Sequence, residues 1–181
     1  QGYSSAASDV YKRQVFLEEK MESLDVLGKR AKAASRQMAK FKITKKNEVL
    51  EMVADELIKK ADEIKKANKA DVDEAVKNGM KPALIDRLTL TDARIEGMAE
   101  GLRQLVALED PVGEITSMKQ RPNGLMIGYK KVPLGVIAII YESRPNVTVD
   151  AFGLTFKSGN AVILRGGSDS INSNIKLVEI I

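Results

Sequence analysis

Residues 136–170 decide the fold: VIAIIYESRPNVTVDAFGLTFKSGNAVILRGGSDS. Two short apolar runs, 136–140 and 161–164, have the composition of parallel strands that are covered on both faces. Val147–Lys157 between them is long enough for a crossover helix, and the following Ser-Gly-Asn supplies its C-terminal stop. The stretch therefore predicts a strand–helix–strand unit, which places the chain in the α/β class.

Polar segments follow both predicted strands, YESRPN at 141–146 and RGGSDS at 165–170. A right-handed crossover brings both strand ends to the same edge of the sheet, where open parallel sheets bind their ligands. Each segment also has a plain structural interpretation, because Pro145 ends the strand, Asn146 suits a helix cap and a Gly-Gly-Ser is commonly a turn. RGGSDS matches neither the dinucleotide fingerprint nor the Walker pattern. Two such segments at one edge nevertheless favour a binding site.

The N-terminal half, residues 21–110, reads as a series of amphipathic helices. The predicted core positions fall into three helices: Leu24, Leu27, Ala31, Ala34, Met38 and Phe41; then Leu50, Val53, Leu57, Ala61 and Ile64 behind a Thr44 cap; and Ile95, Met98, Leu102 and Leu105 behind Thr91 and Asp92. A further short helix is expected at 70–82, ending at Asn78 and Gly79, with Pro82 opening the next segment. No catalytic constellation stands out in this half.

Four segments are expected along the chain. Residues 1–20 lack hydrophobic periodicity and read as a non-native or disordered leader, so Met21 is a candidate start. Residues 21–110 form a helical part, and residues 111–134 form a β-hairpin around the Asn-Gly turn of RPNG. Residues 135–181 form the strand–helix–strand, an incomplete part of a doubly wound sheet.

Composition excludes several classes of site. The chain has no cysteine and no histidine, which removes disulfides, zinc and iron–sulfur centres and histidine-based triads, so no metal site is expected. The 29 basic and 25 acidic residues are interleaved, and the lysine-rich region 29–66 lacks a series of aromatic residues that could stack on bases, so the net charge of +4 does not predict nucleic-acid binding. No apolar run is long enough for a bilayer, which predicts a cytoplasmic protein without a membrane partner.

Long motifs in the chain resemble one family. YESRPNVTVD (141–150) and KSGNAVILRGGS (157–168) are similar to signatures of the gamma-glutamyl phosphate reductase family, also called glutamate-5-semialdehyde dehydrogenases, in the aldehyde dehydrogenase superfamily. The likeness continues through IDRLTLTDARIEGMAEGLRQL (85–105) and DPVGEI (110–115). It covers essentially all of residues 21–181, and it implies that residues 21–110 are the helical N-terminal part of a cofactor domain to which the strand–helix–strand of residues 135–181 also belongs.

This resemblance implies NADPH-dependent reduction of L-glutamyl 5-phosphate to L-glutamate 5-semialdehyde and phosphate, the second step of proline biosynthesis. In the superfamily a cysteine thiolate attacks the acyl carbon, yet this chain has no cysteine. We therefore expect an N-terminal fragment that is inactive alone. The alternatives are another acyl or semialdehyde dehydrogenase of the superfamily and a non-catalytic basic helical module.

The resemblance also implies roles for individual residues. Asn146 is the candidate oxyanion donor, a contribution worth roughly 3 kcal/mol in comparable sites, although Arg144 fits that position as well. Arg144 and Ser143 are otherwise expected to bind the anionic substrate. For the cofactor NADPH/NADP, Arg165, Gly166, Gly167 and Ser168 are the expected binding residues: Arg165 replaces a lysine that contacts the adenosine ribose in many relatives, and Ser168 replaces the glutamate of NAD-preferring ones.

Two protein partners follow from the same likeness. The 115–132 segment resembles the superfamily's oligomerisation hairpin, which implies a homo-oligomer. Glutamate 5-kinase, which would make the substrate, is a further expected partner.

Overall fold

The computed structural model describes residues 23–181, so the expected leader at 1–20 and the candidate start at Met21 lie outside the described residues. In chain order the elements are α2 (Leu24–Met38), α3 (Ile43–Lys59), α4 (Ala61–Lys77), α5 (Pro82–Leu88), α6 (Asp92–Ala107), β1 (Ile115–Gln120), β2 (Met126–Lys130), β3 (Val136–Ile140), α7 (Asn146–Lys157), β4 (Ala161–Arg165), the 3₁₀ turn η1 (Ser168–Ser170) and α8 (Ile171–Ile180).

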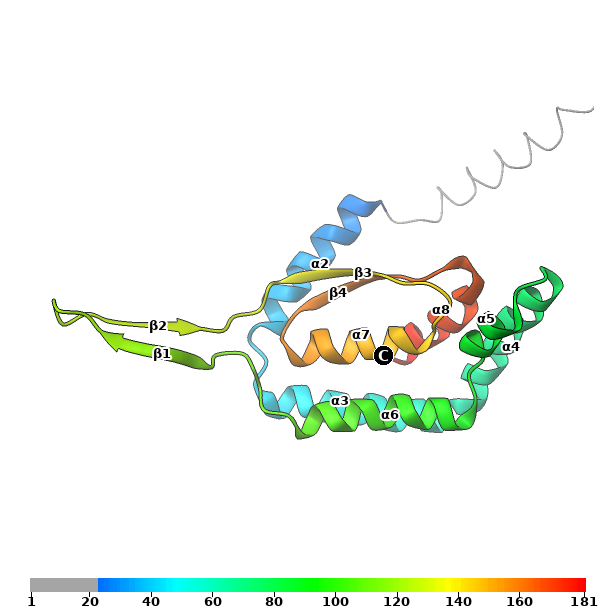
Figure 1. The fold of residues 1–181 in the computed structure, drawn as a ribbon, viewed down its shortest axis with the longest axis horizontal. Helices are drawn as coiled ribbons and strands as arrows, with labels where there is room; N and C mark the ends of the chain where they lie inside the picture. The colour runs from blue at the N-terminus through cyan, green and yellow to red at the C-terminus, as the bar shows by residue number, and fades with distance from the viewer. Residues whose placement is uncertain (1–22) are drawn as a thin grey trace, which may run out of the picture.

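The elements are arranged in layers (Figure 1). Helices α3 and α6 lie side by side, and α7 packs between them and the β3–β4 pair. Helix α2 contacts the two strands, and α4 and α5 lie at the end of the molecule opposite the β1–β2 hairpin. The α/β architecture expected from residues 136–170 is confirmed.

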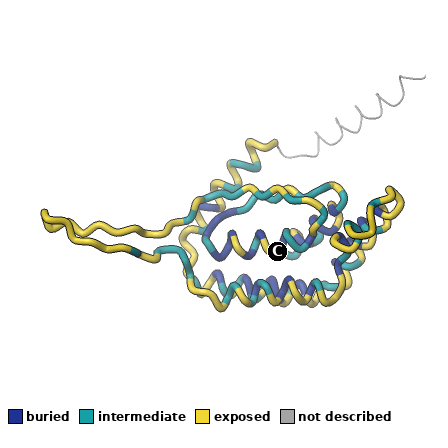
Figure 2. Tube along the Cα trace, viewed as in Figure 1, coloured by how far each residue is buried: buried dark blue, intermediate teal, exposed yellow. Residues whose placement is uncertain are grey.

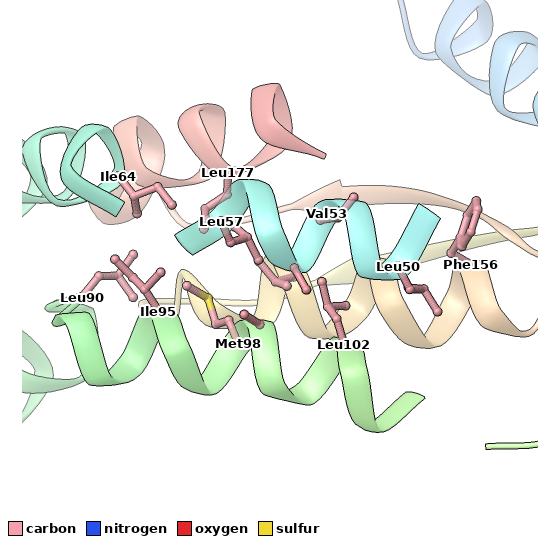
Figure 3. Close-up of a cluster of buried hydrophobic side chains, with 13 residues drawn as sticks. Leu50, Val53, Leu57, Ile64, Leu90, Ile95, Met98, Leu102, Phe156 and Leu177 are labelled. Atoms are coloured by element: carbon pink, nitrogen blue, oxygen red, sulfur yellow. The ribbon is translucent and has the colours of Figure 1, made fainter. Parts of the chain in front are cut away.

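The hydrophobic core lies between α3, α6 and α7. Its largest members approach one another from these helices and from α4 and α8 (Figure 3). They include Leu50, Val53 and Leu57 of α3, Ile64 of α4, Ile95, Met98 and Leu102 of α6, Val149 and Phe156 of α7, and Leu177 of α8. Burying a side chain of this size stabilises the fold by about 1.5–3 kcal/mol. The core positions predicted for 50–64 and 95–102 are confirmed.

The two strands of the crossover unit pair in parallel. Val136 lies opposite Ala161 and Ile140 opposite Arg165, so β4 extends one residue beyond the expected strand. Helix α7 connects them and ends at the Ser158 cap, where Gly159 has a φ of +75°. This positive φ explains why glycine follows the helix.

The predicted hairpin is confirmed. The amide of Arg121 donates to the carbonyl of Leu125 and that of Gly124 to Arg121, both over 2.8 Å, and Gly124 adopts a φ of +86°. The β1–β2 pair projects from the body of the molecule and is almost entirely exposed (Figure 2).

Four local predictions in the N-terminal half were wrong. Thr44 lies inside α3, whose N-cap is Lys42. The helix expected to run on to Ile64 ends at Lys59, and the short helix expected at 70–82 is instead the second half of α4, which ends at the Asn78 cap. In the core stripe expected for the first helix, Leu24, Ala34 and Phe41 are exposed. The apolar spacing continues across the α3–α4 break, so periodicity alone joins the two helices.

Other expected boundaries hold in the structure. Thr91 accepts a hydrogen bond from the amide of Arg94, and Pro82 occupies the first turn of α5. Among residues 23–181, no helix combines the length and apolar character that crossing a bilayer requires.

Candidate functional site

The two polar segments meet at one edge of the sheet, as expected. The amide of Tyr141 donates to the carbonyl of Arg165 over 3.0 Å, directly after the last paired residues of β3 and β4. Beyond this point the hydroxyl of Ser143 donates to the carboxylate of Asp169. The two polar segments that follow the strands are therefore held together by a direct side-chain contact.

The chain turns sharply between β3 and α7. Ser143 has a φ of +44°, an uncommon conformation for a residue with a side chain. The amide of Val147 donates to the carbonyl of Arg144 over 3.0 Å, and the buried Pro145 follows in helical conformation as the N-cap of α7. Asn146 is consequently the first residue of α7 rather than its cap, and its side chain is available for other contacts.

A buried hydrogen-bond network supports this edge from beneath. The hydroxyl of Tyr141 lies 2.6 Å from that of Thr148, which donates to the side-chain carbonyl of Asn174 over 3.0 Å. The amide of Asn174 in turn donates to Ser170 over 3.0 Å. A Cβ at Gly166 would lie 2.1 Å from this Asn174 amide nitrogen. Gly166 is therefore needed for the network whether or not a ligand binds.

The second polar segment presents hydrogen-bond donors to solvent. Arg165 and Ser168 are exposed, and no residue of the described part of the chain forms an ion pair with the Arg165 guanidinium. Within the same residues, no acceptor is found for the backbone N–H groups of Gly166, Gly167 or Ser168. Such donors suit phosphate oxygens, so these residues fit the phosphorylated end of the cofactor that the resemblance implies. Asp169 is the one negative side chain of the segment.

The N-terminus of α8 is already occupied by a side chain. Asp71 of α4 accepts hydrogen bonds from the amides of Asn172 and Ser173 over 3.1 and 2.8 Å, and from the Ser173 hydroxyl over 2.6 Å. These bonds satisfy helix donors that would otherwise attract an anion. A phosphate at this edge would therefore bind the backbone N–H groups of residues 166–168 rather than those in the first turn of α8.

Arg144 and Asn146 line a different space, an open cleft of about 510 Å³ between α5, α6 and the start of α7. Its floor includes the buried Leu90 and Met98. The charged groups around it are Arg87, Arg94, Arg144 and Asp150. The predicted site residues are thus divided: Arg144 and Asn146 face this cleft, whereas Arg165, Gly166, Gly167 and Ser168 do not line it.

Within the cleft, Asn146 and Asp150 are one helical turn apart. The side-chain amide of Asn146 donates to the Asp150 carboxylate over 3.3 Å. Burial raises the pKa of Asp150, and the Asn146 hydrogen bond opposes this effect to a smaller extent. The ionised carboxylate is therefore disfavoured by its surroundings and has no cationic partner among the described residues.

The side chain of Arg94 is held by hydrogen bonds within the protein. Its guanidinium donates to the carbonyl of Thr89 over 2.7 Å and to the Asp86 carboxylate over 3.0 Å, and these contacts fix the corner between α5 and α6. Arg87 and Arg144 have no such contacts with the described residues.

Sequence reasoning assigned no role to Asp150, Arg87 or Asp169. The i, i+4 spacing of Asn146 and Asp150 was a usable signal, because it places both on one helix face. Arg87 reaches the cleft only through the packing of α5 and α6 near α7, which no local pattern reveals.

Curated relatives share the name gamma-glutamyl phosphate reductase. The protein of Lachnospira eligens is 66% identical over 161 residues, which are 89% of this chain and 39% of the relative. That of Thermoanaerobacter sp. is 59% identical over 158 residues, 87% of this chain and 38% of the relative. The chain thus spans about two fifths of the length of these relatives. No family model matches the chain.

Solved structures give the same result. The gamma-glutamyl phosphate reductase of Thermotoga maritima superimposes with a TM-score of 0.81 at 42% identity, over 84% of this chain and 37% of that chain. The Saccharomyces cerevisiae enzyme of the same name gives a TM-score of 0.84 at 33% identity, over 88% and 41%. A Listeria monocytogenes protein described as a probable aldehyde dehydrogenase shares the fold, with a TM-score of 0.58 at 14% identity over 83% of this chain and 30% of that chain.

Proposed function

We propose that this chain, which belongs to the gamma-glutamyl phosphate reductase family, is part of an enzyme that reduces L-glutamyl 5-phosphate with NADPH. In that reaction hydride from NADPH replaces phosphate at the acyl carbon, giving L-glutamate 5-semialdehyde, inorganic phosphate and NADP⁺. This is the second step of proline biosynthesis. The 66% identity to a relative of that name is the observation that carries the proposal.

Arg144 and Asn146 are proposed to act on the substrate. Both line the cleft beside the sheet edge, and both side chains can donate hydrogen bonds to an anion. One of them would stabilise the negative charge that develops on the acyl oxygen, where loss of one donor costs about 3 kcal/mol. Ser143 would hold the loop through its bond to Asp169, and so would position these donors rather than contact the reacting atoms.

The cofactor is proposed to lie against the second polar segment. NADPH supplies the hydride when it is bound. The unpartnered amides of Gly166 and Gly167 would bind phosphate oxygens, and the exposed Arg165 and Ser168 would lie near the ribose 2′-phosphate. Serine carries no charge there, so it would not repel a phosphorylated ribose as a glutamate would.

The protein is further proposed to assemble into a homo-oligomer in the cytoplasm. The exposed hairpin of β1 and β2 would pair with another subunit, because an unpaired strand edge with apolar side chains readily accepts a further strand. A cytoplasmic homo-oligomer that receives its substrate from glutamate 5-kinase is the arrangement we expect.

A coupled assay tests the function. The full-length enzyme that contains these residues is mixed with glutamate, ATP and a glutamate 5-kinase, and NADPH consumption is followed at 340 nm. We expect oxidation of NADPH that requires the kinase and ATP. Turnover of simple aldehydes with no response to the acyl phosphate would instead assign the chain to another dehydrogenase of the superfamily.

A further inference from the structure

The cleft between α5, α6 and α7 contains charged groups that the protein itself leaves without partners. Arg94 is held by Thr89 and Asp86, but the guanidinium groups of Arg87 and Arg144 make no hydrogen bond or ion pair with the described residues. Of the two oxygens of Asp150, only Oδ2 has a hydrogen-bond partner among residues 23–181, the side-chain amide of Asn146. Two cations and one carboxylate are therefore free to bind a ligand.

These three groups surround a space of suitable size. The volume of about 510 Å³ lies in the range of small-molecule sites, and Leu90 and Met98 give it an apolar floor. The groups come from different elements: Arg87 from α5, Arg144 from the loop after β3, and Asp150 from the second turn of α7. Because positive and negative side chains line the same cleft, it suits a ligand that carries both an anionic and a cationic group.

Asp150 is the unusual member of the set. Its side chain is exposed at the open cleft, yet partial desolvation raises its pKa, and such a carboxylate gains from a cation brought by a ligand. Neither free arginine of the cleft pairs with it, although both line the same space. A ligand ammonium group would supply the missing charge, while the arginines remain available for anionic groups.

We propose that this cleft binds the α-amino acid end of the substrate, with Asp150 accepting hydrogen bonds from the α-ammonium group and Arg87 pairing with the α-carboxylate. Arg144, which lies in the loop at the sheet edge and lines the same cleft, would then face the other end of the substrate, the acyl phosphate. The inference rests on the proposed function and adds to it the residues that distinguish a glutamyl substrate from an unsubstituted acyl chain.

The test compares substrates that differ by one group. In the full-length enzyme, run in the direction of NADPH formation with phosphate, kcat/KM is measured for L-glutamate 5-semialdehyde, for 5-oxopentanoate, which lacks the amino group, and for 4-aminobutanal, which lacks the carboxylate. We expect the wild type to prefer the complete substrate by at least about tenfold over each analogue, the value of one charge-assisted contact.

The variants then separate the two contacts. In Asp150→Asn, which keeps the shape and the Asn146 contact, the preference over 5-oxopentanoate should disappear while the preference over 4-aminobutanal remains. In Arg87→Gln the preference over 4-aminobutanal should disappear while the preference over 5-oxopentanoate remains. Glu96→Gln, an exposed position of α6 that does not line the cleft, is the control and should change neither ratio.

A binding measurement keeps this test independent of turnover. L-Glutamate and glutarate are titrated into the wild type and Asp150→Asn by calorimetry. Loss of discrimination between them in the variant supports the amino acid site even if the proposed reaction fails. If Asp150→Asn folds normally and retains the wild-type preference for the amino compound, the assignment of Asp150 is overturned even though the enzyme reduces the acyl phosphate.

Discussion

Asp150 lies on α7, and within the described part of the chain its side chain has one hydrogen-bond donor, the side-chain amide of Asn146. Burial raises its pKa above the usual 3.8, so the folded protein holds the Asp150 proton more tightly than the unfolded chain does. The folded state is therefore disfavoured where Asp150 is ionised, a penalty that is absent below the unfolded pKa and develops as pH rises through the folded pKa. A residue kept in this state is typical of a binding site, where function opposes stability.

At the residue scale, Asp150→Asn should make the full-length protein slightly more stable near neutral pH, because the variant carries no charge at this partly desolvated position, and solvent screening keeps the effect small. The gain in Tm should shrink as pH falls and vanish below 3.8, where both proteins are neutral at this position. Thermal unfolding across this pH range measures the difference. A gain in Tm that does not change with pH would mean that ionisation of Asp150 is not its source.

Cofactor choice is also decided by single residues in this account. Ser168→Glu should weaken NADPH by at least about tenfold while sparing NADH, since like-charge juxtaposition costs several kcal/mol and each ~1.4 kcal/mol is a factor of ten. Arg165→Ala should also weaken NADPH more than NADH, since a charge-assisted contact is worth about 1.5–3 kcal/mol. The ratio of kcat/KM for the two cofactors measures both effects. A wild-type preference for NADH, or an unchanged ratio in Ser168→Glu, would show that this segment does not bind the 2′-phosphate of the cofactor.

At the scale of elements, the packing of α6 against α7 depends on Gly153. A Cβ there would lie 2.6 Å from Leu102 and 2.7 Å from Leu105, both on α6. Gly101, by contrast, is a helical glycine of α6 whose added Cβ would meet nothing within 4 Å. The same substitution should therefore have opposite effects at these two positions.

Gly101→Ala should stabilise the protein by up to about 1 kcal/mol through helix propensity. Gly153→Ala should destabilise it by about 1–3 kcal/mol, because overpacking between the helices outweighs the same propensity gain. Urea denaturation of the full-length variants measures both. Equal stabilisation by the two substitutions would show that Leu102 and Leu105 can move aside without loss.

Elements with strong local signals were the predictable ones. The Asn-Gly turn, the two apolar runs and the Ser-Gly-Asn stop each specify their own structure, and all three form in the folded chain as predicted. The break at Lys60 was missed because no glycine or proline marks it and because Leu57 and Ile64, on either side, keep the helical spacing. At the site, Arg144 and Asn146 were found from the strand end, whereas Arg87 reaches the cleft through tertiary packing.

At the scale of the whole molecule, the β1–β2 hairpin projects from the body, and its two strands are almost entirely exposed. Leu125, Met126 and Ile127 are 57%, 53% and 41% exposed. If these residues pair with another subunit, replacing Leu125 and Ile127 by lysine should convert the full-length oligomer to smaller species in sedimentation velocity. Lys130→Gln on the same strand is the control and should not dissociate it. An unchanged sedimentation coefficient in the double variant would exclude the hairpin from the subunit interface.

The central claim is that the protein to which this chain belongs interconverts an acyl phosphate and an aldehyde, and the phosphate requirement tests it most directly. The full-length enzyme is incubated with L-glutamate 5-semialdehyde and NADP⁺, and absorbance at 340 nm is followed with and without inorganic phosphate. The account predicts that NADPH forms only when phosphate is present and that its rate saturates with phosphate concentration. NADPH formation at the same rate without phosphate would contradict the account.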